Sequence, residues 1–377
     1  MAANDAIPGR SRVPLNDLGR FDDVERAEID AAVSRVLDSG WYVMGPEHDA
    51  FERELAAYAG AAAAVALGNG TDALELGLAA LGIGRGDRVL TVANAGAYAT
   101  TAARLLGATP VYADVDERSL LLTPATLETA LARLDALGTP PKALVVTHLF
   151  GSVVAMPSIL AIARERGMRV IEDCAQAFGA VIDGARVGTF GDLGTLSFYP
   201  TKNLGALGDG GAILTSDPEV ADTVRRLRQY GWTSKYRIGA EHGRNSRLDE
   251  LQAAILRSRL PRLDAANDRR RAIHARYEAA TTAMVTTVAG PYIGHLAVAA
   301  FDDRDAARAR FADAGITTDV HYPVPDHQQA FPVVRAEAVS LPVTERAAAR
   351  ILSVPIFPGL TDDEIERVCA VLAEVDA

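Results

Sequence analysis

Short apolar segments alternate with longer segments of mixed polarity from about residue 50 to residue 215. The short segments are rich in valine, leucine and alanine, as strands buried on both faces are, and the segments between them are long enough for helices. A series of strands and helices in this order predicts a mostly parallel sheet with helices on both faces. The expected strands lie at 63–67, 89–92, 110–113, 144–147, 168–171 and 212–214.

The pattern changes after about residue 250, where long helical stretches precede a short strand. This is the pattern of a smaller α+β domain. We therefore expect a large domain over residues 1–250, with an N-terminal arm at 1–25, and a small C-terminal domain over 251–377. The elements expected in the small domain are a helix at 248–263 that continues through Tyr277, a strand at 295–299, and helices at 304–314 and 362–376.

Composition narrows the class of protein. The chain has 377 residues, of which 49% are hydrophobic, enough for a large core and two domains. A net charge of −11 disfavours a nucleic-acid-binding protein, which usually carries a basic face. The N-terminus lacks a signal peptide pattern, and no segment has the length and hydropathy of a membrane span. We expect a soluble, cytoplasmic protein with no nucleic-acid or membrane partner.

Neither the two cysteines nor the seven histidines are spaced as metal ligands. We therefore predict no metal site and no disulfide. His148 follows an apolar strand and His321 lies in a loop near prolines, and each is more often structural than catalytic in such a position.

Two segments twenty-nine residues apart carry the candidate chemistry. Asp173 ends the apolar strand at 168–171, at the sheet edge where open α/β sheets bind ligands, and Lys202 lies in a glycine-rich turn. A lysine amine can form a Schiff base with the aldehyde of pyridoxal 5′-phosphate and can then move a proton. A carboxylate at the pyridine nitrogen keeps that nitrogen protonated. Asp173 and Lys202 are therefore the candidate catalytic residues.

Each of these residues has an ordinary structural explanation. For an isolated strand-end aspartate such as Asp173, capping of the next helix is the better interpretation, and most lysines are solvated surface charges. The surroundings of Lys202 change this balance. Its turn contains Gly205, Gly208, Gly210 and Gly211, which allow the backbone to approach a ligand closely.

A third segment predicts a phosphate site. At 68–74 a small-residue strand turns into a helix through two glycines. A helix N-terminus presents free N–H groups and a positive dipole end, so we assign the phosphate of the cofactor to Gly70 and Thr71. A plain Asn or Thr helix cap explains the same residues. Ser197, just before the lysine turn, is a further candidate donor to the phosphate.

Taken together, these segments resemble the DegT-type nucleotide-sugar aminotransferases, within the fold-type I pyridoxal-phosphate enzymes. The resemblance implies an aspartate aminotransferase-like fold, with a mostly parallel seven-stranded sheet flanked by helices and a smaller C-terminal α+β domain. The matching stretches are 40–42 with Gly45, 70–74, 172–176, 197–211 and 243–248.

The resemblance also implies roles for particular residues. Lys202 would carry the cofactor, Asp173 would pair with its ring nitrogen, and Gln176 would hydrogen-bond its phenolic oxygen. Asn245 stands where family members bring an asparagine across a dimer interface to the phosphate, so a homodimer with shared sites is expected. Lysine at 202, where some relatives have a histidine and act as dehydratases, argues for transamination.

The segment 94–100 departs from a common family pattern, because a Thr-Phe pair whose ring stacks on the cofactor is absent. Tyr98 would supply that ring if the segment is a loop. The variant resembles the branch that aminates carbon 3 of a 3-keto-6-deoxyhexose attached to a nucleoside diphosphate, as do 232–236 and 321–328. Amination at carbon 4 is the alternative.

The substrates implied by the resemblance are L-glutamate, as amino donor, and a nucleoside-diphosphate keto-sugar. A cluster of cations at 235–247 would contact the diphosphate or the donor carboxylate, and a solvated basic loop is an equally good explanation of any one of them. The candidate substrate-binding residues are Tyr199, Lys235, Arg247 and His327, and the other cations of the cluster are Arg237 and Arg244.

Two other classes of protein share part of this pattern. A nicotinamide-dependent oxidoreductase would use the same sheet, but no Gly-x-Gly-x-x-Gly follows an early strand and opens a helix. A non-catalytic pyridoxal-binding regulator would keep the same motifs, although it would normally need a DNA-binding or partner module, and the chain has no spare basic domain.

Overall fold

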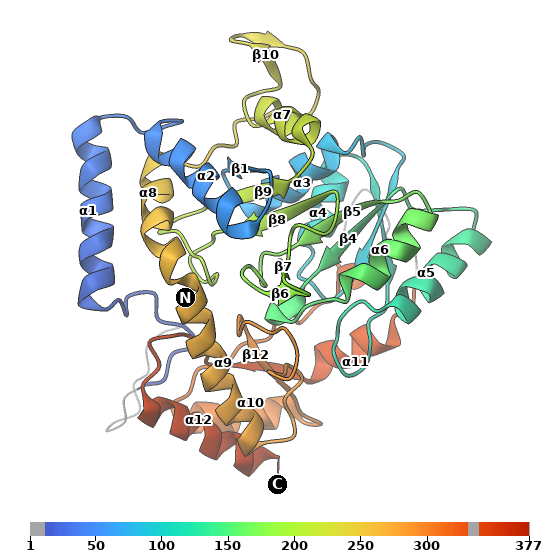
Figure 1. Ribbon diagram of the computed structural model, residues 1–377. Helices are drawn as coiled ribbons and strands as arrows, with labels where there is room; N and C mark the ends of the chain where they lie inside the picture. Colours follow the sequence, from blue (N-terminus) through green and yellow to red (C-terminus); the bar gives the residue numbers. More distant parts are fainter. Residues whose placement is uncertain (1–11, 331–338, 377) are drawn as a thin grey trace.

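The computed structural model describes residues 12–330 and 339–376, and its centre is a seven-stranded sheet (Figure 1). The strand order is β1-β9-β8-β5-β4-β2-β3, and β9 runs antiparallel to both of its neighbours while the remaining pairs are parallel. This confirms the predicted α/β fold with a mostly parallel sheet. The strands are β1 (Ala63–Leu67), β2 (Arg88–Val92), β3 (Thr109–Ala113), β4 (Ala143–Thr147), β5 (Arg169–Asp173), β8 (Leu193–Ser197) and β9 (Gly211–Thr215).

Helices cover both faces of the sheet, because alternate residues of each strand point to opposite faces and both sets are apolar. Val145 and Ile171 pack on one side with α3, α4 and α7, whereas Val146 and Val170 pack on the other side with α5 and α6. Beyond the sheet edge, α1 packs on α8, which also packs on α2. These helices are α1 (Asp23–Ser39), α2 (Pro46–Ala59), α3 (Gly70–Ala80), α4 (Tyr98–Leu105), α5 (Pro124–Ala136), α6 (Met156–Glu165), α7 (Pro218–Leu227) and α8 (Glu250–Arg259).

A second, smaller core lies below the sheet in Figure 1. It joins the antiparallel pair β12 and β13 to α9, α10 and α12, and it also takes in Val13 from the N-terminal segment. The strand expected at 295–299 therefore exists but begins two residues later. The elements of this part are α9 (Leu263–Ala280), β12 (Ala297–Ala300), α10 (Arg304–Asp313), α11 (Pro342–Arg350), β13 (Ile351–Val354) and α12 (Asp362–Val375).

Three short pieces complete the fold. The hairpin β10 (Trp232–Ser234) and β11 (Arg237–Ile238) projects from the molecule beyond α7, and β6 (Val181–Ile182) pairs with β7 (Ala185–Arg186). Short 3₁₀ turns lie at η1 (Leu149–Gly151), η2 (Leu260–Arg262) and η3 (Asp326–Gln328).

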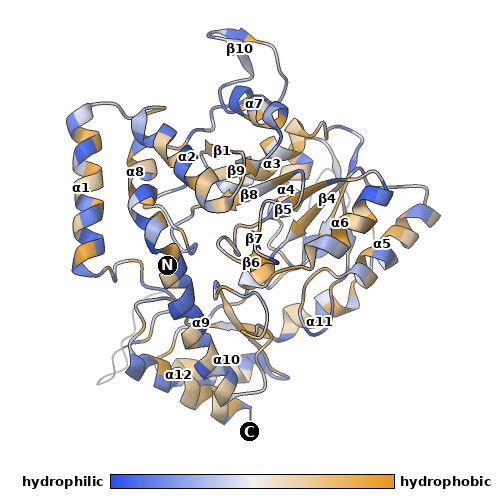
Figure 2. Cartoon of the chain, viewed as in Figure 1, coloured by the Kyte–Doolittle hydropathy of each residue, from blue (hydrophilic) through white to orange (hydrophobic). Residues whose placement is uncertain are grey.

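Hydropathy follows this layering. Figure 2 shows hydrophobic colour concentrated in the central strands, whereas the outer helices carry hydrophilic turns. No described helix is long and apolar enough to cross a membrane. The proposed division near residue 250 falls where α8 begins, and α8, η2 and α9 lead the chain from one core to the other.

Candidate active site

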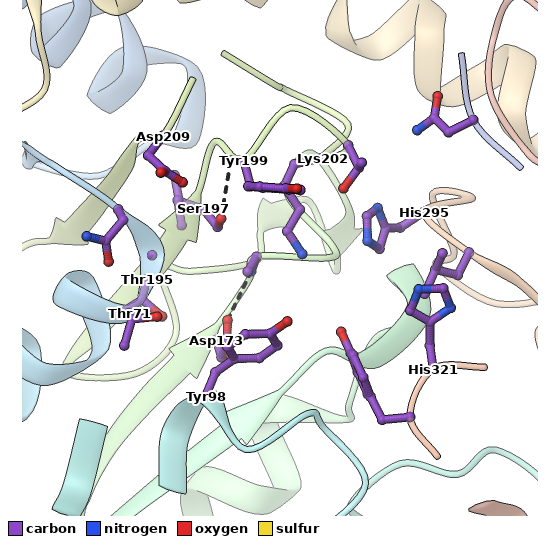
Figure 3. A pocket seen from close by; sticks show the side chains of 18 of the residues that line it. Thr71, Tyr98, Asp173, Thr195, Ser197, Tyr199, Lys202, Asp209, His295 and His321 are labelled. Atoms are coloured by element: carbon purple, nitrogen blue, oxygen red, sulfur yellow. Dashed lines mark hydrogen bonds between the residues drawn. The ribbon is translucent and has the colours of Figure 1, made fainter. Parts of the chain in front are cut away.

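A cavity of about 530 Å³ opens at the carboxyl ends of β5 and β8, where the small core meets the sheet. Its walls come from three places: the strand ends, the N-terminus of α3, and loops of the second half of the chain (Figure 3). This is the sheet edge that the sequence predicted. Among the predicted residues, the cavity is lined by Gly70, Thr71, Tyr98, Asp173, Ser197, Tyr199 and Lys202.

Lys202 extends from its turn toward the middle of the cavity (Figure 3). The turn is closed by the Lys202 amide, which donates to the Tyr199 carbonyl at 2.8 Å, and a side chain at Gly205 would meet the Pro200 carbonyl oxygen at 2.5 Å. Burial lowers the pKa of Lys202 to about 8, although the charge of Asp173 opposes the shift. A lysine in this state supplies a neutral amine near neutral pH, as a nucleophile and proton carrier requires.

The chain contains three lysines, so the assignment has few competitors. Lys142 is exposed and bonds to Asp87 and to the Gly82 carbonyl. Lys235 is exposed on the projecting hairpin. Of the three, Lys202 alone lines the cavity.

Asp173 is the last residue of β5, held between β4 and β8 through its pairing with Thr147 and Thr195. Its side chain is 6% exposed, and Oδ1 accepts a hydrogen bond from the Ala175 amide at 3.1 Å. Burial raises the pKa of Asp173, whereas the Ala175 hydrogen bond and the charge of Lys202 lower it. A carboxylate that burial disfavours in this way is stabilised by a cation at its free oxygen, which is what a pyridinium nitrogen offers.

Glu172, one residue earlier, points to the other side of the strand and closes the site from behind. It accepts hydrogen bonds from the amides of Gly188, Phe190 and Gly191 and lies 3.2 Å from His148 Nε2. Burial acts to raise the pKa of Glu172, but these hydrogen bonds outweigh it and hold the pKa below its usual value. His148 is thus fully buried against Glu172, and the pair makes a rigid support for the strand end.

His148 and Glu172 also lie close enough to Cys174 for a metal site to be considered. The Glu172 carboxylate already accepts three amide hydrogen bonds, and the Cys174 thiol has a pKa raised by burial. Metal ligation needs free carboxylate oxygens and a thiolate. Among the described residues this group therefore does not offer the free ligands that a metal ion needs, and the absence of a metal site stays a prediction.

The phosphate end of the cavity is the start of α3. The Asn69 side chain caps the helix by accepting from the Asp72 amide at 2.8 Å, so the ordinary capping interpretation is correct. Gly70 and Thr71 both line the cavity, and as the first two residues of α3 they have amides without a partner inside the helix. A side chain at Gly70 would lie 2.6 Å from Ser197 Cβ, and Ser197 Oγ accepts from the Tyr199 amide, which leaves its hydroxyl proton to donate. The segment can therefore hold an anion as well as cap a helix.

The condition set for Tyr98, a loop at 94–100, holds only up to residue 97. The segment 94–97 is irregular and α4 begins at Tyr98, whose ring is 46% exposed and lines the cavity. Gln176 lies deeper than expected and is 5% exposed. Its Oε1 accepts from the Phe150 amide at 2.7 Å and its Nε2 donates to Tyr322 Oη at 3.1 Å, which leaves one N–H of the amide group for a ligand.

Besides Gln176, four predicted residues do not line the cavity of this chain. Asn245 and Lys235 are exposed, Arg247 is half-buried, and all three lie in the stretch from the projecting hairpin to α8. His327 Nε2 lies 3.0 Å from Glu345, and its ring packs against Tyr112. Its contact with the sugar remains a prediction that this geometry does not favour. In the cation cluster Arg244 is occupied by ion pairs with Asp72 and Glu75.

The wall from the second half of the chain was not predicted. His295, Asp319, His321 and Tyr322 line the cavity, and Figure 3 shows His295 and His321 on the side away from Thr71 and Ser197. Burial lowers the pKa of both histidines, so their imidazoles are neutral near pH 7. The sequence signal was the segment 321–328, which resembled the family without assigning roles to His321 or Tyr322.

These residues fit pyridoxal phosphate. The cavity offers an amine, a buried carboxylate with one oxygen unbonded among the described residues, and free amides at a helix N-terminus, each at a different side. On an open α/β sheet, this arrangement defines a transferase of the pyridoxal-phosphate class.

Comparison with known proteins identifies the family. The chain belongs to the DegT/DnrJ/EryC1/StrS aminotransferase family, whose model matches residues 23–373. The resemblance found in the sequence is therefore confirmed.

Two relatives and one solved structure are similar over most of their length. The chain is 40% identical over 366 residues to the UDP-N-acetyl-3-dehydro-alpha-D-glucosamine 3-aminotransferase of Acidithiobacillus ferrooxidans, with 96% of this chain and 97% of that protein covered. It is 41% identical over 373 residues to the dTDP-3-amino-3,4,6-trideoxy-alpha-D-glucose transaminase of Streptomyces venezuelae, with 96% of each covered. The crystal structure of NtdA from Bacillus subtilis with bound cofactor PMP has a TM-score of 0.88 and 30% identity, covering 97% of this chain and 85% of that one.

Proposed function

We propose that this protein is a pyridoxal-phosphate aminotransferase that moves the amino group of L-glutamate to carbon 3 of a nucleoside-diphosphate 3-keto-6-deoxyhexose, with the dTDP sugar as the expected substrate. The observation that carries this proposal is the pairing of Lys202 with the buried Asp173 in one cavity of an aminotransferase-family fold. The position on the sugar follows the two relatives, whose names both specify amination at carbon 3.

The residues have defined tasks in this reaction. When bound, pyridoxal phosphate supplies an electron sink for the carbon that loses a proton. Lys202 Nζ accepts the proton released from the amino donor and, in the reverse half-reaction, donates a proton to the sugar carbon that gains nitrogen. The Asp173 carboxylate accepts a hydrogen bond from the ring nitrogen and keeps it protonated. Gly70, Thr71 and Ser197 hold the phosphate.

The remaining side chains shape the pocket around these groups. Gln176 donates its free N–H to the phenolic oxygen, and the Tyr98 ring lies against the cofactor ring. Tyr199, which is 53% exposed at the mouth, contacts the sugar nucleotide. The large domain at 1–250 supplies most of these residues, and the small domain at 251–377 supplies the opposite wall.

The charge balance of the cavity supports a homodimer. Lys202 is the one lysine or arginine among the described residues that line it, yet the ligands carry a phosphate, a diphosphate and carboxylates. Asn245, Arg247 and Lys235 lie outside the cavity of their own chain. A second copy that brings these residues to the site in trans would supply the missing cations.

In the decisive experiment, L-glutamate is first added to the cofactor-loaded enzyme and the absorbance of the cofactor is followed. Separate samples then receive dTDP-3-keto-6-deoxyhexose, its 4-keto isomer or a UDP 3-keto-sugar. Conversion of the cofactor band by glutamate and its return with the 3-keto dTDP sugar is expected. Return with the 4-keto isomer alone would move the amination to carbon 4. A band that no amino donor converts would favour a non-catalytic regulator.

Shared sites have a separate test. Lys202→Ala and Arg247→Ala, each inactive or weak alone, are co-expressed with different tags and the mixed dimer is purified. One of its two sites is then free of both changes, so the mixed dimer should recover about half of the wild-type activity. No recovery would place Arg247 and Lys202 in the same chain's site.

A further inference from the structure

Helix α4 begins at the edge of the cavity without a cap from its own segment. Its N-cap residue is Ala97, which has no side chain that can accept a hydrogen bond, and the next residue is Tyr98. The chain enters the helix through Gly96 and Ala97, both in the left-handed region with φ of 80° and 62°. For Ala97 this conformation is unfavourable, so something outside the segment must hold it.

Asp326, 229 residues further along the chain, holds the start of this helix from outside the segment. Its Oδ1 accepts from the Ala97 amide at 2.9 Å, and its Oδ2 accepts from Thr100 Oγ1 at 2.6 Å. Its own amide donates to the Ala93 carbonyl at 2.7 Å. The Asp326 carboxyl group therefore binds the chain through hydrogen bonds on both sides of Tyr98.

The grip is buried and rigid. Asp326 is 1% exposed, and Thr100 is fully buried with Oγ1 3.2 Å from Tyr112 Oη. Burial raises the pKa of Asp326 to about 7, and the hydrogen bonds from Thr100 and Ala97 oppose that shift. A carboxylate kept in such surroundings is costly unless its hydrogen bonds do something that an apolar residue could not.

The ring that this grip orients is confined from the other side as well. A side chain at Gly96 would lie 2.9 Å from the rings of both Tyr98 and Tyr322, and these two rings pack edge to face with centroids 6.1 Å apart. Tyr98 thus has its backbone held by Asp326 and its ring held by Tyr322. Both Asp326 and Tyr322 belong to the loop after α10.

We infer that Asp326 is a positioning residue of the active site, which holds the start of α4 through the Ala97 amide and the Thr100 hydroxyl and thereby fixes the Tyr98 ring as one wall of the cofactor pocket. The inference rests on the proposed function only in taking the ligand beside Tyr98 to be pyridoxal phosphate. The clamp itself is a property of the protein without ligand.

The chain provides a matched control. Asp114 also holds the start of a helix from a distant segment: it caps α11 by accepting from the amides of Val343 and Thr344 at 2.9 Å each, and it accepts from Thr344 Oγ1 at 2.8 Å. None of these three residues lines the cavity. Loss of the Asp114 cap should therefore lower stability without touching the cofactor.

The test compares Asp326→Ala, Asp326→Asn and Asp114→Ala in the full-length protein. Hydrogen exchange of the peptide spanning 93–101 is measured without cofactor, and Kd is measured by absorbance titration with pyridoxal phosphate. Asp326→Ala should speed exchange in that peptide and raise Kd, each by about tenfold or more, because both hydrogen bonds to the buried carboxyl group are lost. Asp326→Asn keeps the shape of the side chain and an acceptor for the Ala97 amide. Its exchange rate and its Kd should therefore both lie close to those of the wild type. Asp114→Ala should leave Kd unchanged.

If Asp326→Ala fails to fold, Thr100→Val removes one of the two hydrogen bonds at nearly constant shape. The exchange rate of the peptide 93–101 and the Kd for pyridoxal phosphate should then each rise about threefold. Unchanged exchange at 93–101 would overturn the clamp. Faster exchange with an unchanged Kd would overturn the positioning role of Asp326. A wild-type protein that binds no pyridoxal phosphate would instead refute the proposed function, and the exchange result would still decide the clamp.

Discussion

The two walls of the cavity are built in different ways. The sheet wall places Asp173, Ser197 and Lys202 at or just after the ends of adjacent strands, where paired neighbours fix the backbone. The opposite wall, with His295 and His321, comes from loops of the second half of the chain. The groups proposed to hold and move protons, Asp173 and Lys202, are thus positioned by the paired strands of the sheet. The groups of the opposite wall lie on loops, which can vary more.

The walls also differ in charge. Burial shifts the pKa of Asp173 upward and that of Lys202 downward, and each charge partly corrects the other. Burial lowers the pKa of both His295 and His321. Among the described residues that line the cavity, they have no acid partner other than Asp319. The sheet wall is therefore a coupled ionisable pair, whereas the loop wall offers neutral hydrogen-bonding groups.

Lys202→Ala should break the sheet wall most completely. Without the amine, the visible band that forms with pyridoxal phosphate should be absent and transamination should fall by about a thousandfold or more, because both the attachment point and the proton carrier are lost. Lys142→Ala, which removes an exposed lysine paired with Asp87, is the matched control and should behave as wild type. A Lys202→Ala protein with a normal band would refute the assignment.

Asp173→Asn should be the next largest effect. It keeps the shape and the Ala175 hydrogen bond but removes the charge that holds the ring nitrogen protonated, so kcat should fall by about 10²–10³-fold while the band still forms. Asp209→Asn changes an exposed carboxylate of the same cavity and should cost far less. Equal losses in steady-state assays of the two variants would contradict the pairing of Asp173 with the ring nitrogen.

The pH dependence of attachment tests the coupling between Asp173 and Lys202. The neutral amine is the nucleophile, so below the Lys202 pKa of about 8 the rate of band formation should rise about tenfold per pH unit and then level off. N-acetyl-lysine with the same cofactor is the reference, and because its amine has an ordinary pKa of about 10.4 its rate should keep rising over this range. Because the Asp173 charge raises this pKa, Asp173→Asn should move the plateau to lower pH. A wild-type rate still rising at pH 9.5 would be inconsistent with a buried amine.

Tyr322→Phe should have the smallest effect and tests the link between the walls. Its hydroxyl accepts from Gln176 Nε2 at 3.1 Å, so the change removes one hydrogen bond, worth about 1 kcal/mol. The Kd for pyridoxal phosphate should rise about fivefold. Tyr292→Phe, which loses a bond to the Leu296 carbonyl, should affect stability alone. If Gln176→Ala and Tyr322→Phe give strictly additive changes in Kd, the hydrogen bond does not couple the walls.

Local pattern was enough for the sheet wall. Apolar runs of strand length predicted the strands, and strand ends followed by Asp173 and the glycine-rich turn of Lys202 predicted their meeting, because parallel strands end at a common edge. The same reasoning left Tyr98 conditional, since the start of α4 depends on Asp326, far away in the sequence. It also placed His327 at the sugar, whereas the structure pairs its ring with Glu345 and Tyr112.

The sequence by itself determined the α/β fold, the family and the two residues that we propose for the chemistry, because these depend on short segments whose periodicity and turn residues are visible locally. Tertiary structure alone decided which loop residues face the pair. His295, His321 and Tyr322 reach the cavity only because the small core packs against the strand ends. Asp326 reaches the start of α4 only because the chain folds back to that helix. Contacts between residues distant in sequence leave no local pattern to detect, since any buried polar residue satisfies the same rule.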